Sequence, residues 1–504
     1  MIKIVSFVKA FLLFTSLSLL GYSVSAGNPV PITVGSKAFT EGYLLGELVA
    51  QTIENSSSSK VARRFGMGGT GVLFEALRNG SIDLYPEYTG TIAEAILKDS
   101  SLQSISQIRE ALKSSDLIIL DIFKFNNSYG LAVRRAYANK HHLKQISDLI
   151  PLAKEIRGGF SSEFMSRPDC YPGLVLNYGL DFAGNVRSME HSLTYEALAK
   201  KEIDLTDIYT TDGKIRKLDL VVLKDDRHFF REYRAVLFAK QQFIDEHAEA
   251  MRALSDLGNR LDEATMTRLN AEVDVDKREF SSVVLDFISK KHITNLKAPS
   301  VLHRVLVRTH EHLWLVGVSL FFSILVGFPL GIIAYENRIL EQAIILFSSI
   351  VQTIPSLALL CFLIPLFGIG DKPAMVAIFL YGLLPIVINT FVGFKTLDPK
   401  LIEVARALGL NRWERLVRIE IPLASQNILV GIKSSAIIGI GTSTLAALIG
   451  SGGYGVPIIT GLAMNDMEIV LTGAIPATIM ALLAHILFEM LSRVLVPRGL
   501  RITQ

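Results

Sequence analysis

Residues 313–335 read LWLVGVSLFFSILVGFPLGIIAY, a run that contains no Asp, Glu, Lys or Arg. About 20 apolar residues are enough for a helix to cross the hydrocarbon core of a bilayer. Further charge-free runs follow at residues 342–370, 373–394, 434–464 and 469–488. Residue 313 therefore begins an all-α membrane domain of about five spanning helices, which we expect to extend to residue 496.

Two of these runs are too long for one regular span. Residues 342–370 include Pro355 and Pro365, so we expect this helix to be broken or re-entrant. Residues 434–464 include the glycine-rich segment IGSGGYG at 449–455, which we expect to lie outside the helix.

The orientation of the membrane domain follows from its lysines and arginines. The loop at residues 395–418 is strongly basic, and the C-terminal tail, residues 497–504, is basic as well. Positively charged loops remain in the cytoplasm, so counting back over three helices places the residues before 313 outside the membrane. Arg304 and Arg308 oppose this assignment locally, but an exported domain with its own signal can override them.

The N-terminus, residues 1–26, has the parts of a secretory signal. Lys3 and Lys9 accompany an apolar core at residues 10–20, and small residues lead to a cleavage site after Ala26. The alternative is that residues 1–26 remain as an uncleaved membrane anchor. Whether the segment is cleaved or kept, the residues that follow it are exported. We therefore expect a multi-pass protein of the bacterial inner membrane, with its N-terminal domain in the periplasm or outside.

Residues 27–295 alternate strand-like and helical segments. PITVGS at 31–36 and LIILDIF at 117–123 are typical of strands, and TEGYLLGELVAQTIE at 40–54 is typical of an amphipathic helix. This alternation predicts an α/β fold with mainly parallel sheets. About 265 residues is large for one hydrophobic core, so we expect two lobes. A linker at residues 296–312 would join them to the membrane domain.

Composition narrows the classes of function. The chain has 504 residues, a net charge of +3 and a mean hydropathy of +0.39, which does not favour nucleic-acid binding. Cys170 and Cys361 fall in halves that face different compartments, so no disulfide is expected. The pattern G-x-G-x-x-G occurs at 66–71 and 450–455, but the first lacks a buried strand before it and the second ends a membrane helix. With no Walker A sequence, catalytic pair or metal-ligand spacing, we expect neither an enzyme nor a cofactor.

The basic cytoplasmic loop has strong helix signals. DPKLIEVARALGLNRWERLVRIEIPLA at 398–424 begins with Asp398 as a helix N-cap, and Gly409 is a stop signal for that helix. Asn411 can cap a second short helix, which we expect Pro422 to end. The segment is therefore predicted to be a helix–turn–helix exposed to the cytoplasm.

This helix–turn–helix, residues 398–422, resembles the EAA loop of ABC-importer permeases. In that family Glu, Ala and Gly recur at fixed offsets, and here the corresponding residues are Glu403, Ala405 and Gly409. Ile421 stands where the family usually has Leu. The family's loop docks into a groove of a cytoplasmic ABC ATPase subunit, so the resemblance implies such a partner.

The resemblance extends over both halves of the chain. Residues 312–332, 351–370 and 451–466 are similar to permeases of the glycine betaine, choline and carnitine osmoprotectant importers. GSKAFTE at 35–41, GGTGVLFEALRNGSIDLYPEYTGT at 68–91 and YTTDGKI at 209–215 are similar to the substrate-binding proteins of the same importers. The resemblance implies a bilobal, type II-like periplasmic-binding-protein fold fused to a permease. It also implies that two copies of the chain pair, since five helices make half of such a pore.

The family also implies the residues of a ligand site. A quaternary ammonium has no N–H group to donate, but it can lie against aromatic faces, while an anionic end can meet cations, hydroxyls or a helix N-terminus. By similarity, the aromatic cage is Tyr88, Tyr129, Tyr209 and Tyr233, and the anionic end meets Lys37, Thr91 and Arg167. Asn126 and Asn127 are an alternative to Tyr129. Pro86 and Gly90 predict a bend that sets Tyr88 and Thr91 on one wall of a cleft.

The chain departs from the family at one place near this site. Arg231 and Glu232 stand where the family commonly has prolines before its tyrosine, so the substrate stays open among glycine betaine, choline, carnitine and histidine betaine. One alternative is an importer of another zwitterion, such as an amino acid. Another is a membrane-anchored ligand sensor without transport, although a sensor has no need of an EAA-type loop.

Overall fold

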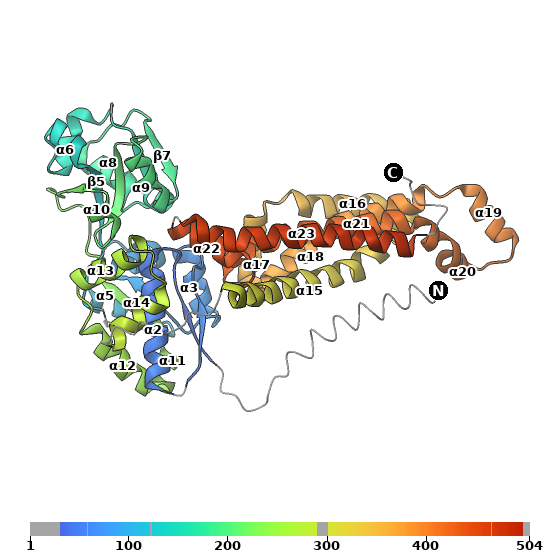
Figure 1. Ribbon diagram of the computed structural model, residues 1–504, viewed down its shortest axis with the longest axis horizontal. Coiled ribbons are helices and arrows are strands. Elements are labelled where there is room, and N and C mark those ends of the chain that lie inside the picture. Colours follow the sequence, from blue (N-terminus) through green and yellow to red (C-terminus); the bar gives the residue numbers. More distant parts are fainter. Residues whose placement is uncertain (1–30, 58, 121–122, 290–300, 465, 497–504) are drawn as a thin grey trace. The chain divides into compact units, whose positions relative to one another are not determined.

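The computed structural model describes residues 31–57, 59–120, 123–289, 301–464 and 466–496. The chain divides into two compact units, one mainly from Pro29–Ala298 and the other mainly from Pro299–Ile458 with Leu471–Gln504. We call them the N-terminal unit and the C-terminal unit and describe each by itself (Figure 1). The predicted signal, the first part of the predicted linker and the predicted tail lie outside the described residues. The two cysteines fall in different units and both are free.

The N-terminal unit contains two five-stranded sheets, one in each of two lobes. In the first lobe the strand order is β2-β1-β3-β10-β4, with bounds Val61–Arg64, Ile32–Gly35, Leu84–Tyr88, Ala235–Lys240 and Leu117–Leu120. In the second lobe the order is β7-β6-β8-β5-β9, with bounds Val186–Met189, Gly158–Ser161, Leu205–Tyr209, Tyr129–Arg134 and Leu220–Leu223. The predicted bilobal α/β fold is confirmed.

The sheets are mixed, whereas the sequence predicted mainly parallel ones. β1 pairs in parallel with β2 and β3, but β10 is antiparallel to β3 and β4. Likewise β6 is parallel to β7 and β8, while β5 is antiparallel to β8 and β9. In each sheet the antiparallel strand is the one that enters directly from the other lobe. Such a strand has no crossover helix before it, and parallel pairing needs one.

Two chain segments cross between the lobes and pair with each other. Asn126 and Arg234 form an isolated β-bridge. The Asn127 N–H donates to the Tyr233 carbonyl at 3.0 Å, and the Ala235 N–H donates to the Phe125 carbonyl at 3.1 Å. This paired crossing is short and two-stranded, as expected for a hinge between lobes.

The segment around Pro86 is not the predicted bend. Leu84–Tyr88 form β3, a fully buried strand in the middle of the first sheet. β1 pairs with β3 through Val34 and Leu84, before the proline, so the missing N–H of Pro86 breaks no bond to β1. The chain turns only after β3, where Thr89–Thr91 begin a helix that continues through Ile92–Leu97.

Helices cover both sheets of the N-terminal unit. Those of the first lobe are α2 (Thr40–Ser56), α3 (Thr70–Arg78), α5 (Ile105–Leu112), α11 (Gln241–Glu246), α12 (Ala248–Gly258), α13 (Glu263–Asp274) and α14 (Phe280–Ser289). Those of the second are α6 (Arg135–His141), α7 (Ser162–Ser166), α8 (Tyr171–Tyr178), α9 (His191–Ala199) and α10 (Lys214–Lys217). Leu44, Leu45 and Leu48 of α2 are fully buried because α12, α13 and α14 pack against this helix. The start of α2 is thereby held firmly at the edge of the first sheet.

The C-terminal unit is helical. Its long helices are α15 (Val301–Glu336), α18 (Asp371–Lys395), α21 (Ile421–Ser443) and α23 (Met467–Leu495). α15, α18 and α21 run side by side (Figure 1). α16 (Arg338–Thr353) and α17 (Ser356–Phe367) meet at a bend of 101°, where Pro355 was expected to break the helix. Within the described residues, 4 helical stretches are long and apolar enough to cross a membrane, or up to 5 if the bent pair is one span.

Two predictions for the C-terminal unit are wrong. The helix expected to start at residue 434 begins earlier, at Ile421 (α21), while the glycine-rich segment at 449–455 lies outside α21, as expected, and leads into α22 (Gly455–Met464). The charge-free run starts at residue 434 because Lys433 is charged. Lys433 nevertheless lies inside α21, where its Nζ is 3.6 Å from the carboxylate of Glu489 in α23. Pro422 ends no helix. It lies in the first turn of α21, where its missing N–H costs nothing. In addition α15 begins at Val301, so residues 301–312 of the predicted linker are helical.

Small residues let the three central membrane helices approach closely. Gly382 of α18 faces α15 and α21, and a Cβ there would lie 2.6 Å from the Ser323 hydroxyl oxygen and 2.4 Å from that of Ser435. The Ser319 and Ser323 hydroxyls donate to carbonyl groups of α18, each at 3.0 Å. Membrane helices associate through such small-residue contacts and interhelical hydrogen bonds.

Candidate ligand-binding site

A cavity of about 300 Å³ lies between the lobes of the N-terminal unit. This volume is at the lower end of the range for small-molecule sites. Its wall includes all four predicted tyrosines, Tyr88, Tyr129, Tyr209 and Tyr233, together with Lys37 and Thr91. Arg167 is not part of the wall but touches it, since its guanidinium donates to the Thr91 hydroxyl at 3.3 Å and to the Tyr233 hydroxyl at 3.4 Å. The structure thus brings the predicted residues together.

Five aromatic rings form a continuous wall along this cavity. The Tyr129 ring lies between two others, with its centroid 5.2 Å from that of Tyr209 and 5.3 Å from that of Tyr233. Phe39 joins the other rings at centroid distances of 5.5 Å to Tyr209 and 6.4 Å to Tyr88. Aromatic faces carry partial negative charge, so a wall of this kind attracts cations.

The two sheets place these rings. Tyr88 is the last residue of β3 and Tyr209 the last of β8, and Tyr129 is the first residue of β5, directly opposite Tyr209 in the ladder. Tyr233 lies on the crossing that returns to the first lobe. Strand ends and crossings meet between the lobes, where ligand sites of open α/β sheets are found. Of Asn126 and Asn127, the alternative to Tyr129, Asn127 lines the cavity together with Tyr129.

The two predicted cations are each paired with a carboxylate. Lys37 Nζ lies 2.6 Å from Glu87 Oε1, and both side chains are buried. Arg167 donates to both oxygens of Asp169, at 3.0 and 2.6 Å, and to Glu163 at 3.1 Å. Burial raises the pKa of Asp169, but the hydrogen bonds and charge of Arg167 lower it more, so this pKa lies below its ordinary value. The positive charge available to a ligand is therefore partly balanced within the protein.

A helix N-terminus also faces the cavity. Gly68 and Gly69 line the wall, and Gly69 is the N-cap of α3. The first N–H groups of a helix have no intrahelical partners and favour an anion. The glycine-rich segment at 66–71, rejected as a dinucleotide motif, thus lies at the candidate site.

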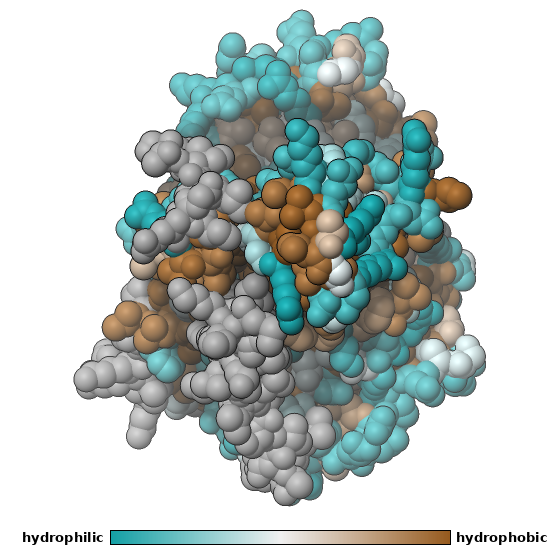
Figure 2. Space-filling view, turned by 90° about the vertical axis from the view of Figure 1, so that its right-hand side faces the viewer, coloured by the Kyte–Doolittle hydropathy of each residue, from teal (hydrophilic) through white to brown (hydrophobic). Residues whose placement is uncertain are grey.

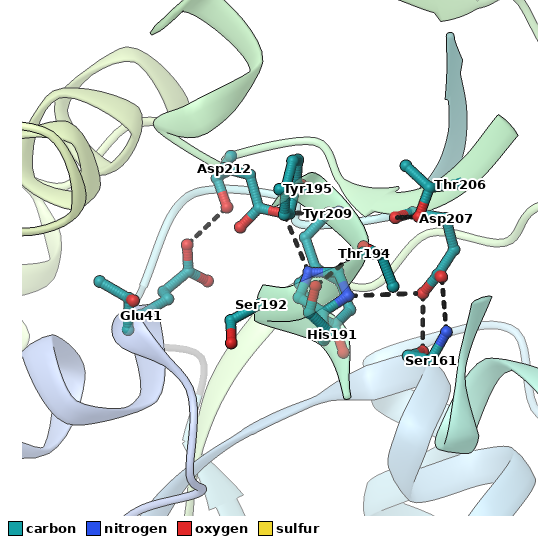
Figure 3. A network of polar contacts seen from close by, with 12 residues as sticks. Glu41, Ser161, His191, Ser192, Thr194, Tyr195, Thr206, Asp207, Tyr209 and Asp212 are labelled. Atoms are coloured by element: carbon teal, nitrogen blue, oxygen red, sulfur yellow. Dashed lines mark hydrogen bonds and ion pairs between the residues drawn. The ribbon is translucent and has the colours of Figure 1, made fainter. Parts of the chain in front are cut away.

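His191 lines the cavity and was not identified from the sequence. Its Nε2 lies 3.2 Å from Asp212 Oδ2 and its Nδ1 lies 3.5 Å from Asp207 Oδ2 (Figure 3). Burial lowers the pKa of His191, but the two carboxylates raise it further, to about 10, so the imidazole is protonated at neutral pH. Its ring centroid is 4.4 Å from that of Tyr209. This ionic network holds Tyr209 in the aromatic wall.

Glu41 joins the cavity wall to both lobes. Its carboxylate, only 3 % exposed, accepts from the Tyr88 hydroxyl at 2.6 Å, Asn127 Nδ2 at 2.8 Å, the Thr211 hydroxyl at 2.5 Å and Asn270 Nδ2 at 2.9 Å. Tyr88 and Asn270 belong to the first lobe, Thr211 to the second, and Asn127 to the crossing. Burial raises the pKa of Glu41 above its ordinary value, although the four hydrogen bonds lower it part of the way.

The cytoplasmic loop is a second candidate site. α19 (Pro399–Ala407) begins after Asp398, which accepts from the Lys400 N–H at 2.9 Å, and Gly409 follows the helix with φ of +78°. α20 (Arg412–Arg415) has a capping box between Asn411 and Glu414, and it continues through a π-helical turn into α21. Glu403 is exposed and Ala405 is buried. The predicted helix–turn–helix is thus present.

Apolar side chains are exposed on this loop. The exposed fractions are 46 % for Leu401, 56 % for Val404, 74 % for Leu408 and 72 % for Trp413. Figure 2 looks onto the side where α19 and α20 lie, and it shows a patch of apolar side chains among hydrophilic ones. Exposed apolar patches of this kind occur where a protein contacts another protein or a membrane.

Two family models match the chain. The substrate-binding domain of ABC-type glycine betaine transport systems matches residues 30–290, just over half of the chain. The inner membrane component of binding-protein-dependent transport systems matches residues 324–500. The first match covers the N-terminal unit and the second covers most of the C-terminal unit.

Two curated proteins and one solved structure are similar to parts of the chain. The glycine betaine/carnitine/choline transport system permease protein of Bacillus subtilis (strain 168) is 41 % identical over 197 residues, which is 39 % of this chain and 91 % of that protein. The ergothioneine transport permease/ergothioneine binding protein of Helicobacter pylori (strain G27) is 33 % identical over 264 residues, 52 % of this chain and 47 % of that protein. A solved glycine betaine/carnitine/choline ABC transporter chain shares 30 % identity and a TM-score of 0.46, over 52 % of this chain and 98 % of its own.

Proposed function

The chain belongs to the family of substrate-binding domains of ABC-type glycine betaine transport systems, with the permease in the same polypeptide, and we propose that it imports a small quaternary ammonium compound. It is a multi-pass membrane subunit that combines ligand capture and translocation. ABC permeases work with a cytoplasmic ATPase, so ATP is the substrate of a partner chain. Relatives of the C-terminal unit are themselves permease subunits.

The aromatic wall is the observation that carries this proposal. A trimethylammonium group cannot be recognised by hydrogen bonding. Each aromatic ring that it touches, however, contributes roughly 0.5 to 2 kcal/mol to the free energy of binding through cation–π attraction. Tyr88, Tyr129, Tyr209 and Tyr233 come from both lobes, so a bound cation would hold the lobes together and close the hinge. Lys37, Thr91 and the N-terminus of α3 are available for an anionic end.

The candidate substrates share the trimethylammonium group. They are glycine betaine, choline, carnitine and histidine betaine, and the name of the Helicobacter relative adds ergothioneine, a betaine of a histidine derivative. A cavity of about 300 Å³ suits compounds of this size. An amino acid also carries a cation, but its ammonium N–H groups need hydrogen-bond acceptors that aromatic faces do not supply, whereas a trimethylammonium group has no N–H to satisfy. A sensor without transport would leave the apolar surface of α19 without a role.

In this proposal α19 and α20 dock into the ATPase and transmit its closure to the pore. Glu403, Ala405 and Gly409 are the proposed coupling residues. The exposure of Leu401, Val404 and Leu408 supports this role, because these side chains would otherwise face water. We further propose that two copies of the chain pair about a two-fold axis, the commonest symmetry of homo-oligomers.

Calorimetry on the purified full-length chain tests the proposed substrate class. The titrants are glycine betaine, carnitine, choline, histidine betaine and ergothioneine, with proline and histidine as compounds that lack the trimethylammonium group. We expect at least one trimethylammonium compound to bind with micromolar or tighter affinity. Binding of proline or histidine alone would contradict the proposal.

A further inference from the structure

Three tyrosines of the cavity wall donate their hydroxyl hydrogens to carboxylates. The pairs are Tyr88 with Glu41 at 2.6 Å, Tyr233 with Asp169, and Tyr195 with Asp212. A phenol that donates to a carboxylate gains electron density in its ring, and hydrogen-bonded groups polarise one another strongly in a buried site. The ring face then attracts a cation more strongly, because the attraction depends on the negative charge of that face.

Glu41 differs from the other two carboxylates in its partners. Asp169 is paired with Arg167 at 2.6 Å, and Asp212 is paired with His191 at 3.2 Å, so a nearby cation offsets each charge. The hydrogen-bond partners of Glu41 in the described part of the chain are all neutral donors. Its charge therefore acts on the Tyr88 ring through the hydroxyl, and Lys37 Nζ already lies over that ring, 5.7 Å from its centroid.

The surroundings of Glu41 offer donors to both of its carboxylate oxygens, which offsets part of the cost of burying its charge. Asn270 Nδ2 also donates to the Thr211 carbonyl at 2.9 Å, and Asn127 Oδ1 accepts from the Thr211 N–H at 3.4 Å. Both amides must then present N–H groups to Glu41, as the hydroxyls of Tyr88 and Thr211 also do. These two amides and two hydroxyls are together the four donors that an ionised carboxylate accepts from.

We propose that Glu41 is a specificity-determining positioning residue, which acts through Tyr88 to favour a positively charged head group over a neutral group of the same shape. The proposal rests on the proposed function, because it requires a trimethylammonium compound in the cavity. Tyr88 touches the ligand, and Glu41 fixes both the position of its ring and its electron density. An uncharged acceptor would hold the Tyr88 hydroxyl in the same position. The negative charge of Glu41 therefore serves to recognise the cationic head group.

The test compares charged ligands with uncharged isosteres on the full-length chain. Choline and glycine betaine are each paired with the analogue in which a tert-butyl group replaces trimethylammonium, and affinities are measured by calorimetry. We expect Tyr88→Phe to lower the ratio of charged to uncharged affinity by roughly three- to tenfold, because one ring loses part of its negative face. Glu41→Gln should lower the ratio similarly, and the double variant should lower it no further than either single variant.

Tyr85→Phe is the matched control. Tyr85 lies on the same strand β3 and is fully buried, but it does not line the cavity, and its hydroxyl faces Glu87 and not Glu41. Removal of that hydroxyl should leave the affinity ratio unchanged. Thermal unfolding of every variant is measured as well, and Tyr88→Phe decides the result if Glu41→Gln does not fold.

The outcomes separate this inference from the proposed function. If Tyr88→Phe weakens charged and uncharged ligands equally, the hydroxyl has a merely structural role and the inference is overturned, while the proposed function stands. If the wild-type chain binds neither compound nor any other trimethylammonium ligand of the calorimetric panel, the proposed function fails and the inference fails with it.

Discussion

Tyr129 is the residue at which the aromatic wall can be tested most directly, because its ring lies between those of Tyr209 and Tyr233. Tyr129→Leu keeps an apolar side chain but removes the negative ring face. We expect binding of the preferred trimethylammonium compound to weaken roughly two- to thirtyfold, which corresponds to the loss of about 0.5 to 2 kcal/mol. Calorimetry on the full-length variant measures the change.

Tyr171→Leu is the control for this substitution. The Tyr171 ring packs on Phe160 and Phe182 in the second lobe, at centroid distances of 5.4 and 6.0 Å, and it does not line the cavity. Its loss should lower the unfolding temperature without changing affinity. Equal affinities of the Tyr129→Leu variant and the wild type would remove Tyr129 from the cage.

His191 makes the stability of the N-terminal unit depend on pH. Its pKa in the folded protein is about 10, above the ordinary value of 6.5, because Asp207 and Asp212 stabilise the imidazolium. The stabilisation is therefore complete below pH 6.5 and is lost as the pH rises through 10. We expect the unfolding temperature of the wild type to fall more steeply over this interval than that of His191→Gln. Parallel curves from scanning fluorimetry would show that His191 does not carry the effect.

Sequence reasoning predicted side chains that line the candidate cavity, but not the residues that support them. Phe39 and Glu41 lie in the segment GSKAFTE at 35–41, which drew attention to Lys37 alone. Glu41 meets Tyr88 from 47 residues away and Thr211 from 170 residues away, and a single sequence does not reveal such pairings. For the same reason His191 could not be connected to its two carboxylates. Residue type and family context indicate which side chains meet a ligand, whereas charge balance depends on contacts formed only in the fold.

At the scale of elements, α19 is expected to couple ATP hydrolysis to transport. Glu403→Ala removes an exposed carboxylate from the proposed contact surface, and Gly409→Asp places a side chain at a φ of +78°, which costs about 1 kcal/mol and alters the end of the helix. We expect both variants to abolish uptake of the identified ligand by cells while leaving its binding to the purified chain unchanged. Lys400→Ala, an exposed change on the same helix, is the control. Normal uptake by both variants would refute the coupling assignment.

The elements that the sequence predicted poorly have identifiable physical causes. The start of α21 was missed because Lys433 interrupts the charge-free run, although Glu489 of α23 pairs with that lysine. β3 was read as a bend because of Pro86, but the neighbouring strand β1 pairs with β3 only before the proline. β5 and β10 run against their neighbours because they enter from the other lobe. Each error arose where a tertiary contact overrode a local preference.

At the scale of the whole molecule, fusion of the two units fixes the ratio of binding domains to pores. Every permease copy carries its own binding domain, so capture of the ligand and its delivery are linked by a covalent tether. A tether replaces a bimolecular encounter with an intramolecular one, which raises the effective concentration of the binding domain. Transport should therefore continue at expression levels where a separate binding protein would be too dilute to dock.

The proposed pairing of two copies predicts how an inactive copy affects an active one. If both coupling loops of a pair must engage the ATPase, co-expression of wild type and Gly409→Asp in equal amounts leaves about a quarter of the pairs fully active. Uptake should then fall to that fraction of the wild-type rate at equal total protein, whereas independent copies would retain about half. Two different affinity tags establish the equal amounts and, by sequential purification, recover the mixed pairs. Co-expression with Lys400→Ala should leave the rate unchanged, and retention of half the rate with Gly409→Asp would show that each copy transports alone.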